Sequence, residues 1–308
     1  MASQRGGTSR RTFLKTTGVL AASALLPVGP ARAAATPIRR AIPSSGEQLS
    51  VVGLGTSKTL NVARDEAARL TDVVQTFFEK GGSVIDSSPM YGSAEEALGV
   101  ILSHIPNHER LFAATKVWTD GKEAGIAQME ASRRLWGVKR FDLIQIHNLR
   151  DWKVHITTLK DWKVNGRVRY IGITTSHGRR HDDLIAALKQ ERFDFVQFTY
   201  NIIDREAEKL LLPLAAERGI ATLINRPFQR SDLFAKVKGK PLPDWAAEFD
   251  CQSWAQFFLK WVISHPNVTC VIPATAKVTH MADNMAAGFG RLPDEAMRSR
   301  MVRHIEAL

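Results

Sequence analysis

Apolar runs alternate with segments of helical periodicity along most of this chain, and this alternation limits the fold more than any other feature. Eight runs are expected to form strands. They are Val51–Thr56, Ser83–Ser88, Leu111–Val117, Asp142–His147, Arg169–Thr174, Phe195–Tyr200, Ile220–Asn225 and Thr269–Pro273. Helical spacing is found in Arg64–Lys80, Ala94–Leu102, Ala124–Leu135, Ala207–Arg218 and Cys251–Ser264.

Strands that alternate with helices form βαβ units and a parallel sheet. Eight such units within about 275 residues favour an α/β fold, a closed (β/α)8 TIM barrel. An open doubly wound sheet is the alternative. The turn Gly53-Leu54-Gly55-Thr56 lacks the third glycine of a dinucleotide-binding fingerprint. We interpret it as a tight turn at a strand end, where the backbone approaches another segment closely.

The first 33 residues have the features of an export signal rather than of a folded segment. Arg10-Arg11 precedes Phe13-Leu14-Lys15, and a mildly apolar run extends from Thr16 to about Gly29. The run is too short and too polar for stable membrane insertion, and Ala31-Arg32-Ala33 has the small-x-small pattern of a cleavage site. The segment resembles a twin-arginine signal peptide, which implies the twin-arginine export machinery as a partner and a periplasmic location. A basic disordered tail is the alternative.

Composition divides the remainder into a polar, proline-containing linker over residues 34–50 and a barrel domain over residues 51–308.

The formal net charge is +11. Five of the positive charges fall in residues 1–33, which hold no acid, so the rest carries +6. Without a dense Lys/Arg block outside the leader, we expect no nucleic-acid partner. Cys270 lies in an apolar run and is expected as a buried thiol, and no Cys/His cluster has metal-ligand spacing.

Polar residues recur at the expected carboxyl ends of the strands, where parallel barrels carry their chemistry. Asp86, Lys116 and His147 lie at the ends of the second, third and fourth strands. Tyr91 follows Asp86 in the stretch Ser83–Gly92, for which an ordinary solvated turn is the alternative interpretation.

These residue types suit proton transfer to a carbonyl oxygen. An unperturbed tyrosine has a pKa of about 10, and a neighbouring Lys116 cation, held by Asp86, is expected to lower the pKa of Tyr91. Tyr91 then donates a proton to a developing alkoxide, while His147 orients the carbonyl oxygen.

The local sequences around these four residues are those of a known family. Ile-Asp-Ser-Ser-x-x-Tyr-Gly, Thr-Lys-Val-Trp and Ile-His-Asn contain Asp86, Tyr91, Lys116 and His147 in the order and spacing of the aldo-keto reductase catalytic tetrad. The chain resembles that family over residues 50–308. The resemblance implies a barrel with an N-terminal β-hairpin and NADP(H) bound across the barrel mouth. It also implies hydride transfer to a small aldehyde or ketone.

The cofactor positions implied by the resemblance depart from the family pattern in places. Thr175 replaces an asparagine, Asn225 falls near the position of a stacking tyrosine, and Arg226 compensates by reaching the pyrophosphate. His280 replaces an arginine near the 2′-phosphate, where Lys277 remains as a contact. NADP(H) is therefore favoured, with NAD(H) as the alternative. The expected cofactor-binding residues are Gly55, Thr56, Thr174, Thr175, Gln197, Asn225, Arg226, Lys277, His280 and Asn284.

Two other functional classes remain open at this point. One is a nicotinamide-binding sensor or regulatory subunit with little turnover, although a sensor has no need of all four tetrad groups. The other is a barrel enzyme of a different class, such as a hydrolase or isomerase, for which the chain shows neither metal ligands nor a nucleophile elbow. We expect a monomer.

Overall fold

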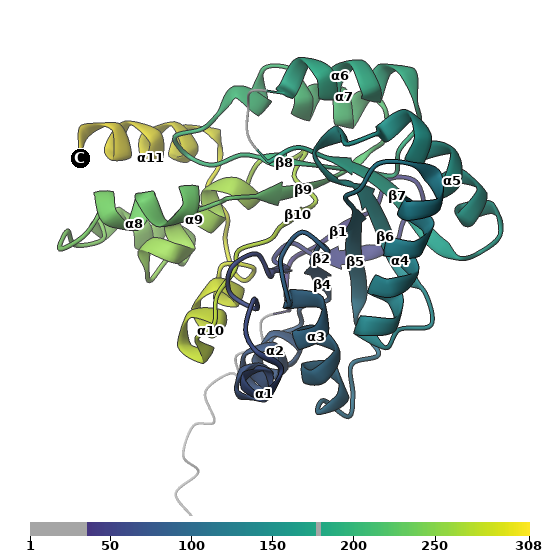
Figure 1. The fold of residues 1–308 in the computed structure, drawn as a ribbon. Coiled ribbons are helices and arrows are strands. Elements are labelled where there is room, and N and C mark those ends of the chain that lie inside the picture. Colours follow the sequence, from purple (N-terminus) through teal and green to yellow (C-terminus); the bar gives the residue numbers. More distant parts are fainter. Residues whose placement is uncertain (1–35, 177–179) are drawn as a thin grey trace, which may run out of the picture. The chain divides into compact units, whose positions relative to one another are not determined.

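The computed structural model describes residues 36–176 and 180–308, so the twin-arginine segment lies outside the described residues. Eight strands form one parallel sheet in chain order, from β3 to β10. Figure 1 labels β4 to β10 of this sheet. Each of them falls within, or within one residue of, a run for which the sequence predicts a strand. Their bounds are β3 Leu54–Gly55, β4 Val84–Asp86, β5 Phe112–Val117, β6 Phe141–Ile146, β7 Val168–Thr174, β8 Phe195–Thr199, β9 Ala221–Asn225 and β10 Cys270–Val271.

Hydrogen bonds between the first and last of these strands close the sheet into a barrel. Val52 forms a parallel bridge with Val271, and the Gly53 and Gly55 amides donate to the carbonyl oxygens of Val271 and Pro273 at 2.8 and 2.9 Å. The expected (β/α)8 barrel is thereby confirmed, and the open doubly wound sheet is excluded.

Glycine is required where the barrel closes. A Cβ at Gly55 would lie 2.7 Å from the backbone oxygen of Ile272, and one at Gly53 would lie 2.9 Å from that of Val84. Both distances are shorter than real Cβ contacts allow, and backbone atoms cannot move aside as a flexible side chain can. The close backbone approach expected of the Gly53–Thr56 turn is therefore confirmed.

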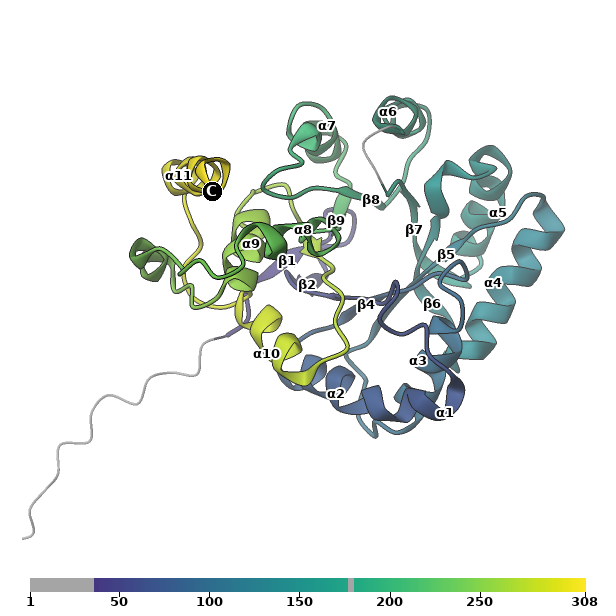
Figure 2. The ribbon, with the colours of Figure 1, turned by 60° about the vertical axis from the view of Figure 1, so that its left-hand side comes forward.

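Helices surround the strands (Figures 1 and 2). The sequence-predicted helix Arg64–Lys80 is divided by a 3-10 turn at Ala68–Leu70. Helices α5, α6, α8 and α10 were not among the helices expected from the sequence. The helix bounds are α1 Arg64–Ala67, α2 Thr71–Glu79, α3 Ala94–Ser103, α4 Lys122–Trp136, α5 Trp152–Val164, α6 His181–Gln190, α7 Leu211–Glu217, α8 Asp232–Lys236, α9 Trp254–Ile263, α10 Val278–Ala286 and α11 Glu295–Ala307.

A two-stranded antiparallel hairpin occupies most of the segment that composition predicts to be a linker. Its strands are β1, Arg39–Ala41, and β2, Gln48–Ser50. The Arg40 guanidinium donates to the carbonyl oxygens of Ile263 and His265 at 2.7 and 2.6 Å. The linker expectation for residues 34–50 fails because charged side chains anchor this segment, whereas the hairpin implied by the family resemblance is present.

Apolar side chains fill the hairpin end of the barrel interior. Ile42 and Leu49 of the hairpin segment are buried with Phe112 and Phe195, which begin β5 and β8. Because the starts of parallel strands share one end of a barrel, the polar side chains at the strand ends are left at the opposite mouth.

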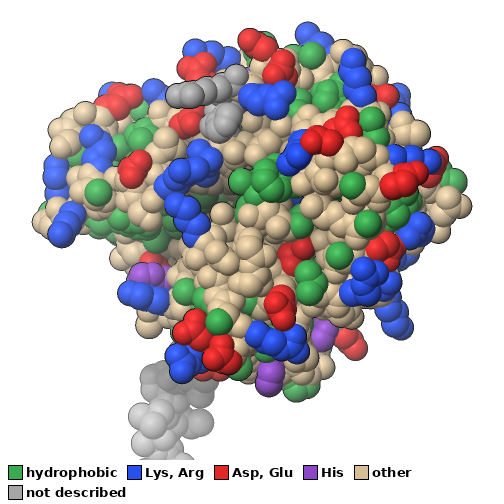
Figure 3. Space-filling model, viewed as in Figure 1, with side chains coloured by type: hydrophobic (Ala, Val, Ile, Leu, Met, Phe, Trp, Pro, Cys, Tyr) green, Lys and Arg blue, Asp and Glu red, His purple; other side chains and the backbone are tan. Residues whose placement is uncertain are grey.

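No helix within residues 36–176 and 180–308 combines the length and the apolar character needed to span a bilayer. On the face drawn in Figure 3, Lys and Arg side chains are interspersed with Asp and Glu side chains. This distribution agrees with the absence of a basic block in the sequence.

Gly55→Ala should lower the free energy of unfolding by about 1–3 kcal/mol, because the added Cβ overlaps the Ile272 carbonyl. Gly288→Ala is the matched control, since the nearest atom to its Cβ is 3.3 Å away. Urea titrations of both variants and the wild type measure the difference. An equal, small effect in the two variants would show that the closing strands can move apart.

Candidate active site

The structure brings the four residues of the expected tetrad together at the barrel mouth. Asp86 ends β4, Lys116 lies one residue before the end of β5, and His147 directly follows β6. The Lys116 Nζ lies 2.5 Å from Asp86 Oδ2 and 5.1 Å from the centroid of the Tyr91 ring. The rings of Tyr91 and His147 meet edge to face, with centroids 5.7 Å apart. Residues from three strand ends and one loop thus form a single cluster.

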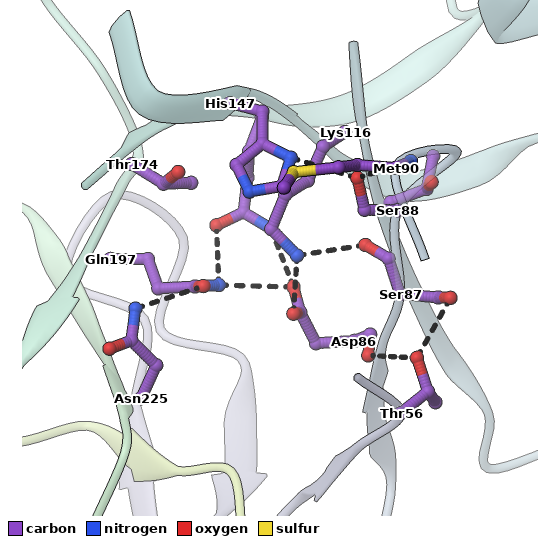
Figure 4. A network of polar contacts seen from close by, with 12 residues as sticks. Thr56, Asp86, Ser87, Ser88, Met90, Lys116, His147, Thr174, Gln197 and Asn225 are labelled. Atoms are coloured by element: carbon purple, nitrogen blue, oxygen red, sulfur yellow. Dashed lines mark hydrogen bonds and ion pairs between the residues drawn. The ribbon is translucent and has the colours of Figure 1, made fainter. Parts of the chain in front are cut away.

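Lys116 is a completely buried cation whose charge is compensated locally. Its side chain is 0% exposed, and Nζ also donates to the backbone oxygen of Ser87 at 2.8 Å (Figure 4). Burial by itself lowers the pKa of Lys116, but the Asp86 carboxylate and the hydrogen bonds to Asp86 and Tyr91 outweigh it, so the pKa is raised. The ammonium group therefore keeps its proton throughout the physiological range.

The second carboxylate oxygen of Asp86 is held by two glutamines. Gln145 Nε2 and Gln197 Nε2 donate to Asp86 Oδ1 at 2.8 and 3.0 Å. The same Gln197 amide also donates to Gln145 Oε1 at 3.1 Å. Sequence reasoning missed Gln145. Its place two residues before His147 could have indicated it, because alternate residues of a strand point to the same face and Gln145 is therefore expected on the side of His147.

Burial has the largest effect on the pKa of Tyr91 and raises it, contrary to the expectation from the sequence. Lys116 does lower the pKa of Tyr91, but desolvation of the phenolate raises it by more, and Asp86 adds to the increase. The pKa of Tyr91 is therefore raised above its ordinary value, and the expected net decrease is wrong. Tyr91 is protonated at neutral pH and can act as a proton donor.

His147 is buried as a neutral imidazole. Burial and the Lys116 charge lower its pKa to about 2. Its Nδ1 lies 2.8 Å from the Ser88 hydroxyl, which already accepts from the Met90 amide at 3.1 Å. We assign the serine proton to this contact with Nδ1, which leaves the imidazole proton on Nε2. His147 is then a hydrogen-bond donor through Nε2.

Several of the expected cofactor positions join this network. Thr56 Oγ1 donates to Ser87 Oγ at 2.8 Å, and Thr174 Oγ1 accepts from the Asn148 amide at 3.1 Å. Asn225 Nδ2 donates to the Thr175 carbonyl at 3.1 Å and lies 3.4 Å from Gln197 Oε1 (Figure 4). Thr174, Thr175, Gln197 and Asn225 therefore lie on the neighbouring strands β7, β8 and β9 or directly after them, and Gly55 and Thr56 lie at the end of β3, with β10 between β3 and β9.

Other expected cofactor positions lie outside the tetrad network. Lys277 and His280 are exposed at the start of α10, and Asn284 is buried further along that helix. Within the described parts of the chain, no hydrogen bond connects these three side chains to the tetrad. Arg226 directly follows β9 and is half-buried.

Within residues 36–176 and 180–308, no group of three or more His, Cys, Asp or Glu side chains is placed to hold a metal ion. Cys251 and Cys270 are both free and buried. The expected buried thiol at Cys270 is thereby confirmed, and burial raises its pKa.

Comparison with known proteins agrees with this geometry. The sequence pattern of the Aldo/keto reductase family matches residues 51–301, most of the chain. The chain belongs to the aldo/keto reductase family. The pattern of a twin-arginine translocation signal matches residues 7–27, which supports export across a membrane.

The individual proteins with similar sequences are distant relatives of this chain. An uncharacterized oxidoreductase of Schizosaccharomyces pombe is 31% identical over 168 residues, 53% of this chain and 52% of that protein. The aldo-keto reductase YhdN of Bacillus subtilis is 25% identical over 214 residues, 64% of this chain and 63% of the relative. The chain thus spans about half to just under two thirds of these relatives' length.

Solved structures show the same fold. An aldo/keto reductase from Klebsiella pneumoniae, in complex with NADP and acetate, superposes with a TM-score of 0.72 at 21% identity, covering 84% of this chain and 93% of the other. The holo form of AKR11C1 from Bacillus halodurans superposes with a TM-score of 0.71 at 21% identity, covering 88% and 96%.

Removing one member of the Lys116–Asp86 pair should be strongly destabilising, because it leaves an uncompensated charge in the barrel. We expect Lys116→Met and Asp86→Asn each to cost about 3–5 kcal/mol of unfolding free energy. The double variant should cost clearly less than their sum. The same cycle on the exposed pair Arg205–Glu306 is the control, with a coupling energy below about 1 kcal/mol. Additive effects in the buried cycle would contradict this description of the pair.

Proposed function

We propose that this chain is an exported NADP(H)-dependent oxidoreductase that reduces small aldehydes and ketones, with Tyr91 as the proton donor. The observation that carries the proposal is a fully buried Lys116–Asp86 ion pair beside a protonated Tyr91 and a neutral His147. This set of charges matches the reduction of a carbonyl group, in which negative charge develops on oxygen.

Each tetrad residue has a defined part in this reaction. His147, with its proton on Nε2, donates a hydrogen bond to the carbonyl oxygen and orients it. Tyr91 gives its phenolic proton to that oxygen as the alkoxide forms. Lys116 stabilises the resulting phenolate, and Asp86, held by the two glutamines, keeps the Lys116 ammonium group in place.

The residues at the mouth also suit a dinucleotide cofactor. Arg226 and Arg230 take part in none of the ion pairs found within the described residues, so their guanidinium groups are free for a phosphate. Both protons of the Gln197 amide serve Asp86 and Gln145. Its carbonyl oxygen has two lone pairs, of which the long contact from Asn225 Nδ2 at 3.4 Å uses one, so the other can accept from a carboxamide. When bound, NADP(H) supplies the hydride. The Klebsiella structures that share this fold were solved with NADP or NADPH, which supports the choice.

The remaining expected positions complete the proposal. Lys277 and His280 would face the 2′-phosphate, and Asn284 would lie on the adenine side; NAD(H) is the alternative cofactor. We further propose that residues 1–33 are a twin-arginine leader removed on export and that residues 34–308 act in the periplasm as a monomer. The match to a twin-arginine signal supports the export step.

Tyr91→Phe tests the proposed proton donor. With NADPH and an aromatic aldehyde, the wild type should consume NADPH, and Tyr91→Phe should be at least about 100-fold slower with NADPH binding unchanged. Tyr170→Phe, the same substitution at the hairpin end where the hydroxyl contacts Glu47, should retain wild-type turnover. Tight NADPH binding by the wild type without turnover on any carbonyl would instead favour a nicotinamide-binding sensor.

The pH dependence of reduction follows from the directions of the two pKa shifts. Because the pKa of Tyr91 is raised, its acid form should persist as the pH rises and be lost only above about 10. Because the pKa of His147 is lowered to about 2, its neutral form is complete at all higher pH values. We therefore expect kcat/KM for reduction to be flat from pH 5 to 9. An acid limb near pH 6.5 that disappears in His147→Gln would contradict the neutral imidazole.

A further inference from the structure

Asn201 links two loops at the barrel mouth. It lies two residues after β8 and is 0% exposed. Its Nδ2 donates to the Arg226 carbonyl at 3.0 Å and to Gln229 Oε1 at 2.9 Å. Its Oδ1 accepts from the backbone amides of Ile203 and Asp204 at 3.1 and 2.9 Å. Both halves of the amide are therefore used, one for each loop.

The loop that receives the Nδ2 protons has an unfavourable backbone conformation. Arg226, Gln229, Arg230 and Ser231 have φ angles of 50°, 47°, 56° and 88°, in the left-handed region that residues with a Cβ rarely occupy. A loop without glycine does not keep this conformation through local preference, so contacts from elsewhere must hold it. Asn201 supplies two such contacts, to the first and the fourth residue of Arg226–Ser231.

The position of this loop has a chemical consequence. Arg226 is half-buried, and the charged or titratable groups that act on it are Arg230, Tyr91 and Asp204. Two arginines on one loop, close enough to affect each other, favour an anion between them. The planar guanidinium group binds phosphate oxygens through paired hydrogen bonds, which requires that its backbone be held in one orientation.

We propose that Asn201 is a positioning residue that holds the Arg226–Ser231 loop in its left-handed conformation and so presents Arg226 to the diphosphate of the cofactor. The cofactor part rests on the proposed function, whereas the holding of the loop does not. Asn201 itself touches neither the substrate nor the tetrad in this arrangement. Its effect is expected on cofactor affinity rather than on the chemical step.

Asn201→Asp separates the two halves of the amide. It preserves an oxygen acceptor for the Ile203 and Asp204 amides but removes both protons given to Arg226 and Gln229. Asn201→Ala removes all four contacts without adding a charge. Thr222→Val is the matched control, because Thr222 is a buried polar residue near the opposite end of β9. Its hydroxyl donates to the Asn267 carbonyl at 2.8 Å, far along the strand from Arg226.

Hydrogen–deuterium exchange of the full mature protein gives a readout that needs no cofactor. Amides of residues 226–231 should exchange at least about 10-fold faster in both Asn201 variants than in the wild type, with the rest of β9 unchanged. Thr222→Val should leave the loop at the wild-type rate. Unchanged exchange in the Asn201 variants, or equal acceleration in Thr222→Val, would overturn the holding role.

Titration with NADPH, followed by tryptophan fluorescence, tests the consequence for binding. Asn201→Asp and Asn201→Ala should bind NADPH about 10-fold more weakly, with kcat at saturating NADPH within about twofold of the wild type. An unchanged Kd, or a loss confined to kcat, would overturn the positioning role. A wild type that binds no NADPH would refute the proposed function and the cofactor part together, while the exchange experiment would still decide whether Asn201 holds the loop.

Discussion

The ion pair between Lys116 and Asp86 places two opposite charges inside a barrel whose other end is filled with apolar side chains. Such a pair is stable only when its remaining hydrogen-bonding capacity is also satisfied. Here the Ser87 carbonyl, Gln145 and Gln197 supply those contacts. The polar layer at the mouth is therefore a connected unit whose members come from β4, β5, β6 and β8. Its geometry depends on the closure of the whole barrel.

The same burial acts in opposite directions on the two groups that face the substrate in the proposed reaction. Desolvation disfavours the charged form of each, so it raises the pKa of the Tyr91 phenol and lowers the pKa of the His147 imidazole. Both are neutral hydrogen-bond donors at neutral pH. Lys116 remains charged beside them because Asp86 compensates it. One cation next to two neutral donors suits an oxygen atom on which negative charge develops.

The barrel closure, the loop after β9 and the N-terminal hairpin are each fixed by a different kind of contact. Closure of the barrel depends on glycines at positions 53 and 55, where no side chain fits between the strands. The loop after β9 is different, because its arginines adopt left-handed backbone conformations without glycine and are held by a buried asparagine from the neighbouring strand end. The hairpin, in turn, is held by the half-buried Arg40, whose guanidinium donates to carbonyl groups at and just beyond the end of α9. In the last two cases a polar contact between distant segments fixes the local conformation.

The sequence by itself determined the eight strands and the barrel, because periodicity and the positions of strand ends are local properties of the chain. Its family motifs also singled out the four residues that the structure brings together at the mouth. Composition alone failed for the hairpin, whose polar residues resemble a linker although Arg40 anchors them to the Ile263 carbonyl; only the family resemblance implied the hairpin that is present. Sequence reasoning also missed Gln145 and Asn201, whose partners lie far away along the chain. Only the tertiary structure decided the sign of the Tyr91 shift. The sequence shows that a lysine is near, but desolvation depends on everything that surrounds the phenol, and that is settled only when the barrel closes.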